Sequence, residues 1–68
     1  MAVAAQVRLV NDVARHFQHL PHDEAVAGVV EHVRSFWEPR MREQLLAAVD
    51  AADPDLDPLA VEAAAALR

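Results

Sequence analysis

Apolar positions recur at helical spacing along the first part of the chain. At about 100° per residue, Arg8, Asp12 and Arg15 share one arc of a helix, and apolar residues fill the opposite side. The apolar side consists of Val3, Val7, Val10, Val13, Ala14 and Phe17. This pattern predicts an amphipathic helix over residues 3–19 with one buried face.

A break and a second helix follow. Proline disfavours helical geometry at the residue before it, so Pro21 ends the first helix by Leu20. Asp23 is the expected N-cap of a helix over residues 24–37. Its apolar arc holds Val26, Val29, Val30, Val33, Phe36 and Trp37. Gly28 costs this helix roughly 1 kcal/mol relative to alanine. Either another backbone approaches closely there, or the glycine is a tolerated surface residue.

Pro39 starts a third helix, because proline is pre-set for the first helical position. The predicted helix covers residues 39–52. Its buried face comprises Met41, Leu45, Ala48, Val49 and Ala52. Arg42 falls inside this apolar arc, where it would pair with Glu38 four residues earlier or with a carboxylate of a partner.

The last helix is predicted over residues 58–67, with Asp57 as N-cap and Pro58 as its first residue. Leu56 and Val61 occupy the two positions of a hydrophobic staple. A helix apolar nearly all round lies deep between the other helices or docks on another chain. The sequence thus predicts one all-α domain over residues 1–68, a small bundle of three longer helices plus a short C-terminal helix.

Length and charge narrow the possible functions. A 68-residue chain buries only about 60% of the surface that its unfolded form exposes, and this one has no cysteine for a disulfide. We therefore expect it to gain stability from a partner. The net charge of −5 and the absence of lysine argue against nucleic acid and anionic membranes as targets. No signal peptide or membrane-spanning segment is found, and a cytoplasmic location is expected.

Histidines are the main candidates for chemistry. His16, His19 and His22 are spaced by three residues, which raises the hypothesis of a metal site. Pro21 interrupts the helix before His22, and surface histidines explain the pattern as well. His32, at the edge of an apolar arc, is expected to be a hydrogen-bonded packing residue. No nucleophile–base pair, calcium loop or phosphate-binding loop is present, so we predict no catalytic, metal or cofactor site in this chain.

A cluster between the second and third helices is the predicted partner interface. It comprises Phe36, Trp37, Pro39, Arg40, Met41 and Arg42. Tryptophan, arginine and methionine are enriched in interface cores and hot spots. The alternative is that Phe36 and Trp37 close the corner between the two helices as part of the core.

Several stretches resemble the delta subunit of NAD-dependent formate dehydrogenases. They are Pro21-His22-Asp23-Glu24-Ala25, His32, Phe36-Trp37-Glu38-Pro39-Arg40-Met41-Arg42, Leu56-Asp57-Pro58-Leu59 and Glu62-Ala63. The resemblance extends from about Arg8 to Leu67, and the Phe-Trp-x-Pro-x-Met-Arg string is its most specific part. It implies a small subunit without a cofactor of its own, in a cytoplasmic complex. Larger subunits would carry a molybdenum or tungsten pterin, iron–sulfur clusters and FMN, and would oxidise formate and reduce NAD.

Three hypotheses follow from the sequence. In the first, the chain is a non-catalytic subunit that binds the larger formate dehydrogenase subunits, the catalytic alpha subunit first among them, and supports assembly or stability. In the second, it is a helical module that associates with copies of itself. In the third, it is an accessory protein that binds metal through its histidines.

Overall fold

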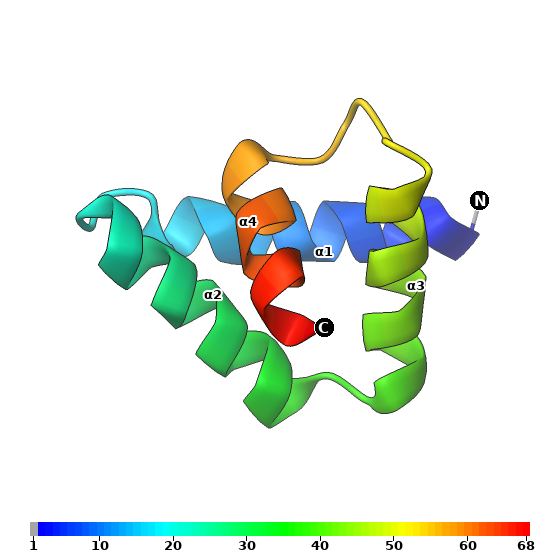
Figure 1. Ribbon diagram of the computed structural model, residues 1–68, viewed down its shortest axis with the longest axis horizontal. Coiled ribbons are helices and arrows are strands. Elements are labelled where there is room, and N and C mark those ends of the chain that lie inside the picture. The colour runs from blue at the N-terminus through cyan, green and yellow to red at the C-terminus, as the bar shows by residue number, and fades with distance from the viewer. Residues whose placement is uncertain (1) are drawn as a thin grey trace.

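Four helices make up the fold, in a computed structural model that describes the backbone of residues 2–68 and the side chains of residues 5–68 (Figure 1). They are α1 (Ala2–Phe17), α2 (His22–Phe36), α3 (Pro39–Asp50) and α4 (Pro58–Leu67). No strand occurs within residues 2–68, and the all-α prediction is confirmed. Val3, predicted on the buried face of the first helix, has its side chain outside the described ones.

Both ends of α1 and α2 and the end of α3 differ from the predicted ones by one or two residues. α1 ends at Phe17, before a turn, and α3 ends at Asp50. Ala52, predicted on the buried face of the third helix, instead has a φ of 55° beyond its end and is exposed. The assignment of Asp23 as N-cap is wrong: the cap is Pro21, whose extended backbone (ψ 149°) leaves its carbonyl oxygen free to accept from the Ala25 N–H at 2.9 Å.

The start of α4 agrees with the prediction. The Asp57 side chain accepts a hydrogen bond from the Leu59 N–H at 2.8 Å, and Pro58 is the first helical residue. Leu56 is buried, whereas Val61, its predicted staple partner, is 37% exposed. The predicted N-cap is thus confirmed, and the Leu56–Val61 staple contact stays a prediction.

α4 lies in the middle of the bundle. In Figure 1 it is seen between α2 and α3, in front of α1, and it contacts all three of these helices. Ala60, Ala63 and Ala64 are buried where it meets them. Small side chains let helices approach closely. Of the two positions predicted for this apolar helix, between the other helices or docked on another chain, the first is observed.

Residues from all four helices and the α3–α4 connection form the core. Its larger buried side chains are Val7, Val10, Val29, Val30, Val33, Trp37, Leu45 and Leu56. Phe17 packs at the edge of this core, with its ring against Gly28: a Cβ built on Gly28 would lie 2.5 Å from the nearest ring carbon. The close approach foreseen at Gly28 is thus made by a side chain of α1 rather than by a backbone.

Candidate partner interface

The Phe36–Arg42 segment connects α2 to α3 and divides into an inner and an outer set of side chains. Trp37 is only 8% exposed and belongs to the core, and Met41 packs against that core. Phe36, Pro39 and Arg40 are exposed. The six residues predicted as an interface therefore do not form one continuous surface.

The Trp37 side chain points into the core from the C-cap position, directly after the end of α2. Its N–H donates to the Val33 carbonyl oxygen at 2.9 Å, and its own backbone is extended, with φ −92° and ψ 135°. Phe36, the last helical residue, is 74% exposed although it lies on the predicted apolar arc. Of the two alternatives for this pair, burial in the core holds for Trp37 and does not hold for Phe36.

Arg42, predicted inside the apolar arc of the third helix, is half-buried. Its backbone N–H donates to the Glu38 carbonyl oxygen at 3.1 Å. No ion pair joins the two side chains, although both are among the described residues. The pairing proposed within the chain is therefore not formed, and pairing with a partner's carboxylate stays a prediction.

A shallow hollow of about 210 Å³ lies between α1 and α2 and is lined by Asp12, Val13, His16, Phe17 and His32. His32 connects it to Phe36, because the two rings lie 4.9 Å apart and are tilted by 43°. Leu9, one helical turn before Val13, is 45% exposed. Leu9 and Phe36 thus extend the apolar surface beyond the hollow.

These additions to the interface were missed in the sequence. Leu9 could have been found from the sequence, because it is a large apolar residue of the first helix that lies outside the arc of predicted buried residues. The hollow itself had no sequence signal, because it depends on how α1 and α2 cross.

The histidines do not converge. His16 and His32 line the hollow, whereas His22 contacts Glu62 of α4, with 2.9 Å between Nε2 and Oε2. Among the described residues, no group of three histidine, aspartate or glutamate side chains is placed to hold a metal ion. The metal hypothesis gains no support from this arrangement.

The Ser35 hydroxyl is near the Glu31 carboxylate on the same helix. It lies 3.5 Å from a Glu31 carboxylate oxygen, at the limit of a hydrogen bond. His32 instead packs its ring against that of Phe36.

An exposed aromatic ring beside an apolar hollow is typical of a surface that contacts another molecule. The sequence comparison agrees: residues 6–64 match the family described as NADH-dependant formate dehydrogenase delta subunit FdsD. The chain belongs to this family, and it is a small accessory subunit of an oxidoreductase complex with larger subunits. A search of curated proteins and a search of solved structures returned no match. No described helix is both long and apolar enough to cross a membrane.

Proposed function

We propose that this chain is a non-catalytic subunit that binds the catalytic alpha subunit of a formate dehydrogenase complex and supports its assembly or stability. The observation that carries the proposal is the family match over residues 6–64, which spans all but the ends of the chain. The exposed part of the Phe36–Arg42 segment supplies a surface for binding.

The redox chemistry then belongs to the larger subunits. The sequence has no cysteine, so it offers no thiolate ligand for an iron–sulfur cluster. In this proposal the chain holds no metal or cofactor of its own and works in the cytoplasm with the complex.

Co-purification tests the proposal. The chain, carrying an affinity tag, is co-expressed with the larger formate dehydrogenase subunits, and a second strain lacks it. We expect the alpha subunit to co-purify with the tagged chain. We also expect the strain without the chain to yield less assembled complex and less formate-dependent NAD reduction. Failure of the subunits to co-purify, together with unchanged activity in the second strain, would rule the function out.

The choice of variants depends on burial. Trp37→Ala would remove a core side chain and cost about 3–5 kcal/mol of stability, so a loss of binding would report unfolding. Arg40→Ala and Phe36→Ala change exposed side chains and leave the core intact. They are the informative pair, and Arg8→Ala on the solvent side of α1 is their control.

A further inference from the structure

We propose that the hollow between α1 and α2, extended by Leu9 and Phe36, binds an apolar anchor side chain of the larger subunit that is flanked by arginine or lysine. This surface is called the α1–α2 groove below. The inference rests on the proposed function and deepens it, because it identifies the contact surface and the chemistry of the segment that covers it.

The floor of the groove is apolar and well supported. Val13 and Phe17 line it from α1, and the Phe17 ring is held against Gly28 of α2. An apolar cavity of about 150 Å³ accommodates a benzene-sized molecule. The hollow measures about 210 Å³, so one aromatic or branched aliphatic side chain fits into it.

Phe36 stands at one end of this floor. Three large apolar side chains are recorded as exposed among residues 5–68, and two of them, Leu9 and Phe36, flank the groove. Phe36 is the most exposed of the three, and its ring packs against that of His32, which lines the hollow. Aromatic residues, phenylalanine among them, are enriched at protein interfaces.

Three carboxylates lie in or beside the groove, which is also lined by His16 and His32. Asp12 lines it on α1. At 100° per residue, Glu24 and Glu31 flank Gly28 and His32 on the side of α2 that points to solvent. The arginine of α2, Arg34, lies on the other flank, where its guanidinium donates to the Ala66 carbonyl oxygen of α4 at 3.5 Å.

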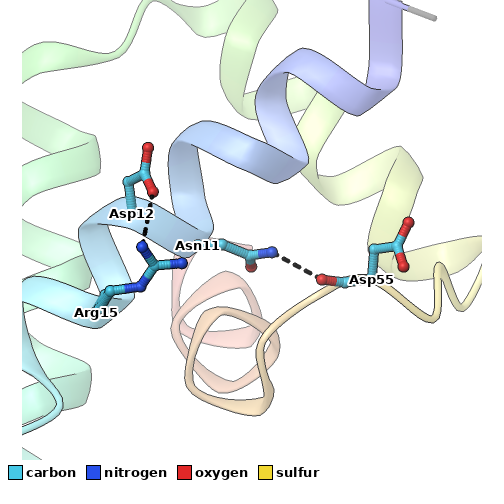
Figure 2. Close-up of polar contacts among 4 residues, drawn as sticks. All are labelled: Asn11, Asp12, Arg15 and Asp55. Atoms are coloured by element: carbon cyan, nitrogen blue, oxygen red, sulfur yellow. Dashed lines mark hydrogen bonds and ion pairs between the residues drawn. The ribbon is translucent and has the colours of Figure 1, made fainter.

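Arg15, which pairs with Asp12, balances this charge only weakly. Arg15 lies 3.7 Å from the Asp12 carboxylate, and both side chains are well exposed (Figure 2). Exposed pairs of this kind contribute little. The rim is therefore complementary to a positively charged segment.

The same charges disfavour a second copy of the chain as occupant. A copy docked on this groove would bring its own carboxylates against those of Asp12, Glu24 and Glu31, and each chain carries a net charge of −5. Like charges placed opposite each other oppose association. A basic segment of the larger subunit meets both requirements, the apolar floor and the acidic rim.

Titration of the full-length chain against the formate dehydrogenase complex purified without it tests the groove. Phe36→Glu and Leu9→Glu change its apolar part, and Val61→Glu changes the third exposed apolar side chain, on α4. We expect Phe36→Glu and Leu9→Glu each to raise the dissociation constant about tenfold or more, and Val61→Glu to change it less than about twofold. Circular dichroism of each variant checks that the helices are intact.

A charge reversal tests the rim. Glu31→Lys on α2 is compared with Glu43→Lys on α3, which makes the same change of net charge at another exposed position. We expect Glu31→Lys to weaken binding severalfold and to reduce its dependence on salt, and Glu43→Lys to have a smaller effect.

The outcomes separate this inference from the proposed function. If the wild-type chain does not bind the complex, both fail. If it binds and the groove variants bind equally well, or the controls weaken binding as much, the groove is wrong and the function stands. If the wild-type chain instead forms a dimer that Phe36→Glu dissociates, a second copy covers the groove, which overturns the inference.

Discussion

At the scale of single residues, Asn11 joins the first helix to the last connection. Its side-chain amide donates to the Asp55 carbonyl oxygen at 2.7 Å (Figure 2) and accepts from the Asp57 N–H at 2.8 Å. Asp57 in turn caps α4. One side chain thus positions the start of the helix that fills the middle of the bundle.

Replacing Asn11 with aspartate keeps the acceptor, removes the donor and adds a negative charge beside Asp53, Asp55 and Asp57. We expect Asn11→Asp to lower the free energy of unfolding by about 1–3 kcal/mol, because the lost hydrogen bond and the added repulsion act together. Urea denaturation followed by circular dichroism measures it. Gln18→Glu makes the same chemical change at an exposed position and serves as control. Equal stability of the two variants would show that the amide contributes nothing.

The contrast between Asp57 and Asn11 explains what the sequence could predict. The Asp57 cap joins two residues that are two positions apart in the sequence, so the Asp-Pro pair alone predicts it. The contacts of Asn11 span 44 and 46 residues. Such contacts depend on the packing of whole helices, for which a single sequence gives no local sign.

At the scale of helices, the periodic pattern identified the elements and most of their buried faces, and it failed where helical geometry stops. Phe36 lies on the arc of Val29 and Val33, but it stands at the last turn of α2 and is left exposed. Trp37 has an extended backbone, so the helical angle does not describe where its side chain points. That Phe36–Arg42 binds a partner stays a prediction, and the different burial of its two aromatic residues was not resolved from the sequence.

Phe17 of α1 packs its ring directly on Gly28 of α2. We expect Gly28→Ala to destabilise the fold by about 1–2 kcal/mol, because the crowding of the ring outweighs the gain in helix propensity of up to about 1 kcal/mol. In a Phe17→Ala background the same substitution should become stabilising. Thermal unfolding of the four proteins of this double-mutant cycle measures the coupling, and its absence would contradict the contact.

α4 offers a second comparison between helix faces. Ala64 is fully buried and Ala65 is exposed, one position apart in the same helix. We expect Ala64→Leu to cost about 1–3 kcal/mol through overpacking and Ala65→Leu to change stability by less than about 0.5 kcal/mol. Chemical denaturation decides between them. If the two variants behaved alike, α4 would not occupy the place among the other helices that the structure gives it.

At the scale of the whole molecule, the argument for a partner changes its basis. The sequence suggested that an apolar helix in so short a chain needs cover from another molecule. The structure covers that helix within the chain, through contacts with α1, α2 and α3. Among the described residues, the large apolar side chains that stay exposed are Leu9 and Phe36 beside the α1–α2 groove and, to a smaller extent, Val61 on α4. Because the exposed apolar surface is confined to a few side chains, we expect a partner to make a specific contact with it rather than to bury a whole helix.

This leads to a prediction for the isolated chain. Because its apolar helix is internal and copies of net charge −5 repel one another, we expect a monomer of 7.5 kDa that unfolds in one cooperative transition. Sedimentation equilibrium at micromolar concentration, at low and at physiological salt, measures the mass. A dimer at both salt concentrations would favour the hypothesis of a self-associating module. A dimer only at physiological salt would show that charge repulsion, and not the covered helix, keeps the chains apart.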